Sequence, residues 1–293
     1  MRLGHVRFGE HHRIGVVEAD HSHVRVLPAS VGKVDDVVRG GPEALEAVRR
    51  ACKSTDPVPL STVTLGSPLL RYNRDILCVG WNYTDHFYES SGKRGGQDLD
   101  APPEHPTFFG KSPLTALGPN DDIDFDSSLS DRWDWEAEIA LIIGTPGRSI
   151  AEDSAMSHVF GFAVANDVTL RDVQRAHGGQ WLKGKSIDRT MPLGPWITTP
   201  DDVENQTDLL IECMVNDQVM QKASTADMVY TFARLIAELS AGMTLLAGDV
   251  ILTGTPSGIG NAREPAVFLH PGDQLVTRVH GLGTLTNEVV PVR

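Results

Sequence analysis

The sequence predicts a mainly β protein with some α structure. Short apolar runs recur along the chain and end at glycine, proline or polar residues, which is the pattern of buried or half-buried strands. The apolar spacing of an amphipathic helix is found over residues 37–52 and 224–242. Hydrophobic residues make up 40% and charged residues 22% of the 293 residues, so the chain can bury a substantial core.

Residues 1–70 are expected to form a small N-terminal accessory domain. Its expected elements are two strands of a hairpin and a helix, at residues 13–18, 23–27 and 37–52. The prolines at Pro57, Pro59 and Pro68 then interrupt regular structure. We therefore place the main domain at residues 71–293.

The main domain is expected to hold most of the strands. They are predicted at residues 76–80, 135–143, 160–165, 250–252, 274–279 and 289–292. The helix predicted over residues 224–242 has one apolar face that includes Phe232 and Leu239, and Gly242 suits its C-terminal end. Residues 90–106 are rich in glycine, proline and charge, which indicates a loop or lid.

The charge of the chain excludes several classes of partner. The formal net charge is −13 and no Lys/Arg run occurs, so neither nucleic acid nor an anionic membrane surface is an expected partner. No run approaches the roughly 18 apolar residues of a membrane span, and no signal peptide is recognisable. The three cysteines, Cys52, Cys78 and Cys213, match no zinc-site spacing, which favours free thiols and a cytoplasmic location.

Two glutamates stand out in an otherwise apolar segment. Glu136 and Glu138 are two residues apart in an expected strand, so both side chains point to one face. Because paired buried carboxylates repel and are costly to desolvate, either this face is solvated or a cation compensates them. Asp167 ends the next apolar run and can converge with both glutamates. This all-oxygen set suits Mg²⁺ first, with Mn²⁺ or Ca²⁺ as substitutes.

Two further pairs have the spacing of helical neighbours. Arg171 and Gln174 would share the face of Asp167 if a helical turn begins there, and both suit a substrate carboxylate. His86 and Glu89 would face each other on one turn, where the carboxylate can orient the imidazole as a general base. Each residue taken alone is also consistent with a solvated surface.

Five segments, in order, resemble the fumarylacetoacetate hydrolase family. They are Asp134-Trp-Glu-Ala-Glu-Ile-Ala-Leu-Ile-Ile-Gly, Asn166-Asp-Val-Thr-Leu-Arg-Asp-Val-Gln, Gln180-Trp-Leu-Lys-Gly-Lys-Ser-Ile-Asp, Gly248-Asp-Val-Ile-Leu-Thr-Gly-Thr-Pro-Ser-Gly-Ile-Gly and Phe268-Leu-His-Pro-Gly-Asp. Upstream, Gly80-Trp-Asn-Tyr-Thr-Asp-His-Phe-Tyr-Glu resembles the segment that carries the acid–base pair in its hydrolytic and decarboxylating branches. The resemblance implies a β-roll or barrel-like core and a homodimer.

The resemblance also implies roles for individual residues. Glu136, Glu138 and Asp167 would be the metal ligands, and His86 with Glu89 the acid–base dyad. Lys185 would stabilise an enolate, and Arg171, Gln174 and Thr255 would line the substrate site. Arg189 stands where many relatives carry a small hydroxyl residue, so it would either add positive charge to the site or point outward.

From the sequence, the preferred function is hydrolysis of a C–C bond in a small 2,4-dioxo acid, such as an acylpyruvate, with Mg²⁺ stabilising the enolate that leaves. The first alternative is a decarboxylase or tautomerase/isomerase of a 2-oxo diacid such as oxaloacetate, because the same residues serve each reaction. An alternative of another class is a protein that binds an oxo acid without catalysis.

Overall fold

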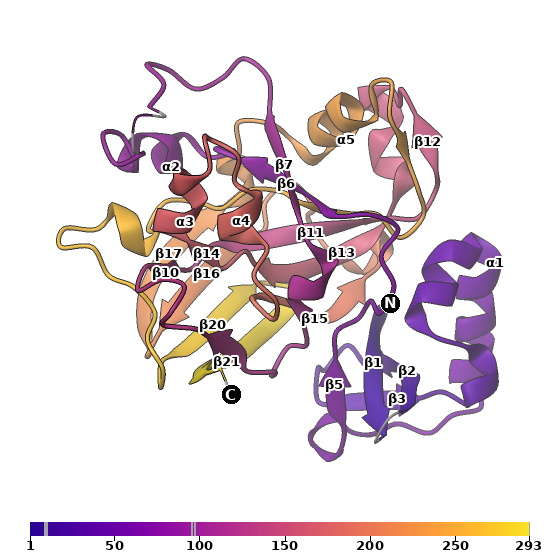
Figure 1. Cartoon of the computed structure of the whole chain (residues 1–293). Helices are drawn as coiled ribbons and strands as arrows, with labels where there is room; N and C mark the ends of the chain where they lie inside the picture. The colour runs from indigo at the N-terminus through magenta and orange to yellow at the C-terminus, as the bar shows by residue number, and fades with distance from the viewer. Residues whose placement is uncertain (9–10, 95, 97, 293) are drawn as a thin grey trace.

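The computed structural model describes residues 1–8, 11–94, 96 and 98–292, and two β-sheets dominate it (Figure 1). The larger sheet has 12 strands: β1 (Arg2–Phe8), β2 (His11–Val17), β3 (His23–Val26), β4 (Val58–Pro59), β5 (Thr64–Gly66), β6 (Ile76–Gly80), β7 (Thr107–Lys111), β8 (Ala116–Leu117), β11 (Ala137–Ile143), β13 (Val159–Asn166), β15 (Met191–Thr198) and β19 (Val250–Leu252). The smaller sheet has five: β9 (Ile123–Phe125), β16 (Leu210–Val215), β17 (Gln218–Ser224), β20 (Gln274–Val279) and β21 (Gly283–Pro291).

Short elements complete the chain. Two small strand pairs are β10 (Trp133–Asp134) with β14 (Thr169–Leu170) and β12 (Gly147–Arg148) with β18 (Thr244–Leu245). The helices are α1 (Val34–Cys52), α2 (Thr84–Glu89), α3 (Arg171–Ala176), α4 (Leu182–Lys185) and α5 (Phe232–Ser240). The expected mainly β architecture with some helices is therefore confirmed.

The main core lies between the two sheets. Strand β11 alternates between two apolar environments, since Ile139 and Leu141 pack in the cluster shared with the smaller sheet, whereas Ala140 and Ile142 pack on the opposite face. This alternation is the period of two expected for a strand that is buried on both faces. It also decides on which face Glu138 lies.

The first residues of the chain extend the large sheet. Strand β1 pairs with β15, with Leu3 opposite Ile197, so the hairpin of β2 and β3 continues the sheet outward. Helix α1 covers this part (Figure 1). It begins at Val34, before the expected residue 37, and its course is broken at Gly41, where φ is 63°. The division of the chain at residue 70 stays a prediction.

The prediction of a helix over residues 224–242 is wrong for the first half of that segment. Strand β17 ends at Ser224, a 3₁₀ turn spans Thr225–Asp227, and the helix begins only at Phe232. The reason is tertiary, because the side chain and backbone of Asn82 take up the backbone N–H groups of Val229 and Tyr230. A helix through this segment would have to give up both hydrogen bonds.

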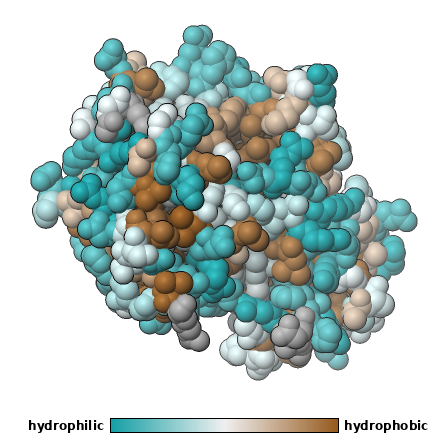
Figure 2. Space-filling model, viewed as in Figure 1, coloured by the Kyte–Doolittle hydropathy of each residue, from teal (hydrophilic) through white to brown (hydrophobic). Residues whose placement is uncertain are grey.

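Hydrophilic residues cover most of the face in Figure 2, with hydrophobic residues in small groups among them. Within the described ranges, no helix has both the length and the apolar character needed to cross a membrane. All three cysteines are free thiols, with Cys78 and Cys213 buried.

Candidate active site

Three carboxylates converge because β11 and β13 pair in register. Ala137 lies opposite Asn166 and Glu138 opposite Ala165, so the next pair along the ladder is Glu136 with Asp167. The backbone N–H of Asp167 donates to the Glu136 carbonyl at 2.8 Å, which continues the pairing beyond the strand end. Positions two apart share a face, so the three carboxylates lie on one face of the strand pair.

The carboxylate cluster is buried and compact. One oxygen from each of Glu136, Glu138 and Asp167 lies within 4.8 Å of the other two. Their exposed fractions are 5%, 1% and 0%, so water screens them little. Compensation must therefore come from neighbouring cations.

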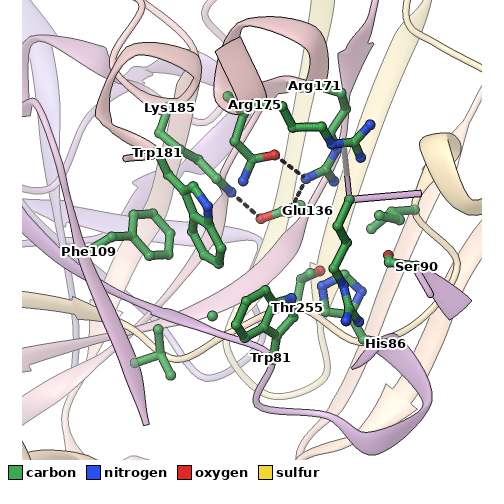
Figure 3. Close-up of a pocket in the computed structure, with 15 residues that line it drawn as sticks. Trp81, His86, Ser90, Phe109, Glu136, Arg171, Arg175, Trp181, Lys185 and Thr255 are labelled. Carbon is green, nitrogen blue, oxygen red and sulfur yellow. Dashed lines mark hydrogen bonds and ion pairs between the residues drawn. The ribbon is translucent and has the colours of Figure 1, made fainter. Parts of the chain in front are cut away.

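Two lysines supply part of that compensation. Lys185 Nζ lies 2.5 Å from Glu136 Oε2 (Figure 3). It also lies 2.7 Å from Asp167 Oδ2. Lys111 Nζ lies 2.8 Å from Asp167 Oδ1 and donates to the carbonyls of Val168 and Lys185. Both ammonium groups are almost completely buried. Neither makes an ion pair with Glu138 among the described contacts.

The two glutamates respond in opposite ways to this arrangement. Burial alone would raise the pKa of Glu136, but the charges of Lys185 and Arg171 lower it to about 2. For Glu138, burial and then the charges of Asp167 and Glu136 raise the pKa well above its usual value. Burial would lower the pKa of Lys185, but Asp167 and Glu136 raise it, so its ammonium stays charged.

The donor set fits a hard divalent cation. Among the described contacts, Glu138 receives only a backbone hydrogen bond, from Gly254 N–H at 2.7 Å, and it has no cationic partner, unlike Glu136 and Asp167. Three buried carboxylates with one uncompensated charge are a costly arrangement that a bound cation would relieve. Oxygen ligands of this kind suit Mg²⁺, Mn²⁺ or Ca²⁺, and the set does not choose between them.

Helix α3 fixes a guanidinium beside the cluster. Arg171 Nε lies 2.7 Å from Asp134 Oδ2, and Nη1 lies 2.7 Å from Glu136 Oε1. Among the described residues, its buried Nη2 has no hydrogen-bond partner, and Nη1 also donates to Gln174 Oε1 at 3.3 Å. Asp134 is itself held by the backbone N–H groups of Gly260 and Asn261. Arg171 is thus rigidly placed with one donor free.

Helix α4 reaches the site because it packs tightly on α3. A Cβ atom at Gly184 would lie 2.4 Å from the Cα of Gln174, which is closer than real contacts, so glycine is required there. The next residue is Lys185, whose ammonium therefore enters the cluster from α4. The close packing of α4 on α3 therefore fixes the position of Lys185 relative to Arg171.

The expected acid–base pair forms on α2. His86 Nδ1 lies 2.7 Å from Glu89 Oε1, and the other oxygen of Glu89 accepts Gly258 N–H at 2.7 Å. Because a carboxylate only accepts, Nδ1 donates and Nε2 is left as the basic nitrogen. His86 is 6% exposed and lines the same cavity as Glu136 and Lys185.

The cavity is small, about 50 Å³, and has an aromatic wall. Trp81, Trp181 and Phe109 form this wall, with the Trp81 and Trp181 rings 5.0 Å apart. In Figure 3, His86 and Trp81 lie across from Lys185, with Glu136 between them. Thr255 also lines the cavity, and its hydroxyl accepts a hydrogen bond from Gln221 at 2.8 Å.

All nine residues expected at the site are brought together. Eight of them belong to the cluster or line the cavity, namely His86, Glu136, Glu138, Asp167, Arg171, Gln174, Lys185 and Thr255, and the ninth, Glu89, contacts His86. Arg189 lies elsewhere, because its Nε pairs with Asp124 Oδ2 at 3.0 Å and its side chain is 47% exposed. The outward alternative for Arg189 is the one that the structure supports.

Sequence reasoning missed three charged residues. Lys111 ends an apolar strand, Asp134 lies just before the glutamate segment, and Arg94 follows α2. All three side chains are at least nine-tenths buried. A buried charge at the end of an apolar run is the one sequence signal that could have identified Lys111.

The stretch at residues 90–106, expected to be a lid, is described apart from residues 95 and 97. Its described part is attached at several points, since Lys93 Nζ donates to Ala262 O at 2.9 Å and the Tyr230 hydroxyl donates to Pro103 O. His105 Nδ1 lies 3.1 Å from Glu238 Oε1. Closure of this stretch over substrate stays a prediction.

Comparisons with a family model and with similar proteins identify the same family. The model of the fumarylacetoacetate (FAA) hydrolase C-terminal region matches residues 75–290. Oxaloacetate tautomerase YisK of Bacillus subtilis is 40% identical over 230 residues, which cover 78% of this chain and 74% of that protein. The human mitochondrial oxaloacetate tautomerase FAHD2A is 42% identical over 252 residues, 85% of this chain and 77% of that protein.

Solved structures agree on the fold. A fumarylacetoacetate hydrolase from Exiguobacterium antarcticum superposes with a TM-score of 0.85 at 35% identity, and both chains are covered completely. Maleylpyruvate hydrolase from Sphingobium, solved with manganese(II) and pyruvate, gives a TM-score of 0.81 at 29% identity over the whole of both chains. The β-roll core expected from the resemblance is thereby confirmed.

Proposed function

This chain is an enzyme of the fumarylacetoacetate hydrolase family, and we propose that it interconverts the keto and enol forms of a small 2-oxo diacid of the oxaloacetate type, with a divalent cation bound. The observation that carries this proposal is that Glu136 of the carboxylate cluster, Lys185 and His86 line one cavity. The two curated relatives described above are both oxaloacetate tautomerases, which favours proton transfer over the C–C hydrolysis that we preferred from the sequence.

The 2-oxo acid end of the substrate would bind at the cluster. Glu136, Glu138 and Asp167 would hold the cation, which supplies Lewis acidity to the 2-oxo group and so makes the neighbouring C–H more acidic. Arg171 Nη2, a buried donor with no hydrogen-bond partner among the described residues, would bind the adjacent carboxylate together with Gln174.

His86 would move the proton. Its Nε2 takes the proton from C3 and gives it to the 2-oxygen, while Nδ1 stays hydrogen-bonded to Glu89. The Lys185 ammonium stabilises the negative charge that develops on that oxygen. One proton changes place, no C–C bond breaks and no water is consumed.

Hydrolysis of a 2,4-dioxo acid is the second candidate. The His86–Glu89 pair could activate a water as readily as it could remove a C–H proton. One of the similar structures is a maleylpyruvate hydrolase, which supports this second candidate. A protein that binds an oxo acid without catalysis would have no need of the buried base, the lysine and the cluster together.

A substrate panel separates these candidates. The purified protein is assayed with oxaloacetate, acylpyruvates and unsaturated 2-oxo diacids, each with Mg²⁺ and with excess chelator. The proposal predicts metal-dependent enol–keto conversion of oxaloacetate without loss of carbon. Faster cleavage of an acylpyruvate would favour the hydrolase, and no turnover of any oxo acid would favour the binding protein.

Assembly and location remain proposals. We expect a homodimer in the cytoplasm, and Mg²⁺ as the cation. The human relative is named as mitochondrial, which is a statement about that protein. Light scattering of the purified chain and cell fractionation test the two expectations.

A further inference from the structure

Arg94 is a buried cation that the chemistry above does not use. It lies five residues after α2, lines the same cavity as His86 and is 5% exposed. Burial lowers the pKa of its guanidinium. A buried arginine normally has its donors satisfied by carboxylates or carbonyls, so its contacts decide what it can bind.

Most of its donors are unused. Nε and Nη1 are both buried without a hydrogen-bond partner in the described structure, and Nη2 donates to the carbonyl of Phe87. The nearest carboxylate is that of Asp98, whose Oδ1 lies 3.8 Å from Nη1, beyond hydrogen-bond distance. The Asp98 side chain is 34% exposed, so water weakens even this attraction.

Aromatic rings hold the guanidinium in place. Its central carbon lies 4.2 Å from the centre of the Phe87 ring and 5.2 Å from that of Trp81. Both distances are within the range of cation–π contacts, which hold the guanidinium beside the two rings. The side chain is therefore fixed to the helix that carries His86, with two donors still available.

The charge of the cavity favours a dianion. Among the described residues, its lining contains four cationic side chains, Arg94, Arg171, Arg175 and Lys185, and one carboxylate, Glu136. Arg171 and Lys185 contact the carboxylate cluster directly, whereas no ion pair links Arg94 to that cluster among the described contacts. Two separate cationic positions match the two carboxylates of a 2-oxo diacid.

We propose that Arg94 binds the distal carboxylate of the substrate and so selects 2-oxo diacids over 2-oxo monoacids. The proposal rests on the proposed function, because it names which end of that substrate Arg94 receives. Held between the cluster and Arg94, a four-carbon diacid would present its C3 hydrogens to the His86 side of the cavity. Arg94 is thus a specificity-determining residue, and the proton itself is carried by His86.

A matched pair of substrates tests this assignment. Oxaloacetate and its 4-methyl ester both enolise at C3, but only oxaloacetate has a charged distal group. With Mg²⁺ present, we expect Arg94→Gln to lower kcat/KM for oxaloacetate by roughly 10- to 100-fold, the range for a lost charge-assisted hydrogen bond, and to change the ester rate less than about threefold. Arg94→Lys should keep part of the preference for the diacid.

Controls separate folding from recognition. Arg189→Gln removes an arginine outside the cavity and should leave kcat/KM unchanged for both substrates. The melting temperature of each variant reports whether it is folded. As a readout without turnover, calorimetric binding of malate, a 2-hydroxy diacid, should weaken in Arg94→Gln, whereas binding of oxalate, which has no distal carboxylate beyond C2, should not.

The outcomes are distinct. An unchanged preference for the diacid in Arg94→Gln, or an equal loss for diacid and ester in a folded variant, overturns the role of Arg94. If the wild type converts neither substrate, the proposed function fails, and malate and oxalate binding alone then decides whether Arg94 recognises a distal carboxylate.

Discussion

The carboxylate cluster and the His86–Glu89 dyad reach one cavity through Glu136 and His86, and they are built in different ways. Glu138 lies on β11, and Glu136 and Asp167 adjoin the paired ends of β11 and β13 in the large sheet, where backbone register fixes the three side chains on one face. The dyad lies on α2, a helix of six residues. Its position depends on single contacts such as that between Glu89 and Gly258 N–H.

This difference separates binding from proton transfer. A site fixed by sheet register keeps its geometry as long as the core is folded, which suits a cation that must be held with several ligands. A short helix joined to a loop can open locally at low cost, which suits a base that must meet the substrate after it enters. Substitutions in the two regions should therefore fail in different ways.

The largest effect is expected in the cluster. Glu138→Gln should weaken Mg²⁺ binding by at least about 10²-fold and remove metal-dependent turnover, because one of three oxygen ligands loses its charge. The wild type should gain about 2.7 kcal/mol of stability when Mg²⁺ is present at 100 times its Kd, and this gain should be lost in the variant. Thermal melting of the wild type and of the variant, each with and without Mg²⁺, measures this gain in stability.

Glu204→Gln, an exposed glutamate, is the matched control and should behave as wild type. Without metal, Glu138→Gln should be folded and at least as stable as wild type, since it removes a like charge from a buried cluster. If the wild type is fully active in excess chelator, the metal assignment is wrong.

The second effect tests the dyad. His86→Ala should lower kcat by roughly 100- to 10,000-fold, the usual scale for a general base, and should leave the melting shift caused by Mg²⁺ unchanged. His105→Ala, which alters an exposed histidine paired with Glu238, is the control. Loss of the Mg²⁺ shift in His86→Ala would show that the two regions are not separable.

The smallest expected effect concerns a second buried histidine, His5, which affects stability and has no part in the site. His5 Nε2 accepts the N–H of Val34 at 3.0 Å and Nδ1 lies 3.0 Å from Ser67 O, so the ring is neutral and structural. Burial lowers its pKa despite Asp35 nearby. The unfolded chain therefore binds this proton more readily, and stability is lost as the pH falls below about 6.5.

His5→Gln should flatten that slope, because an amide can accept from Val34 without titrating. Melting temperature measured between pH 5 and pH 8 checks this, with turnover at pH 8 expected to be unaffected. An unchanged slope would mean that His5 does not titrate with unfolding.

Local patterns predicted several strands, including β6, β11, β13 and β19, and the residues of the cluster, but they missed β1, β15, β16 and β17. The period of two placed Glu136 and Glu138 on one face, and the abrupt end of the apolar run indicated Asp167. The spacing of His86 and Glu89 likewise predicted their contact, since one helical turn brings them together.

Contacts between distant segments could not be read in this way. The start of α5 depends on Asn82, which lies 148 residues before Tyr230 along the chain. Arg94 enters the site from a segment whose local sequence gives no sign of the cavity, and Lys111 is indicated only by its place at the end of an apolar run. Their roles become visible only when burial and unused donors can be counted.

One measurement tests the central claim most directly. Enol oxaloacetate is mixed with the protein in D₂O, and absorbance of the enol and NMR of C3 are followed with Mg²⁺ and with excess chelator. The account predicts ketonisation accelerated only with metal, deuterium incorporated at C3 and no pyruvate beyond the uncatalysed amount. Equal rates with chelator, or rapid release of pyruvate, would contradict it.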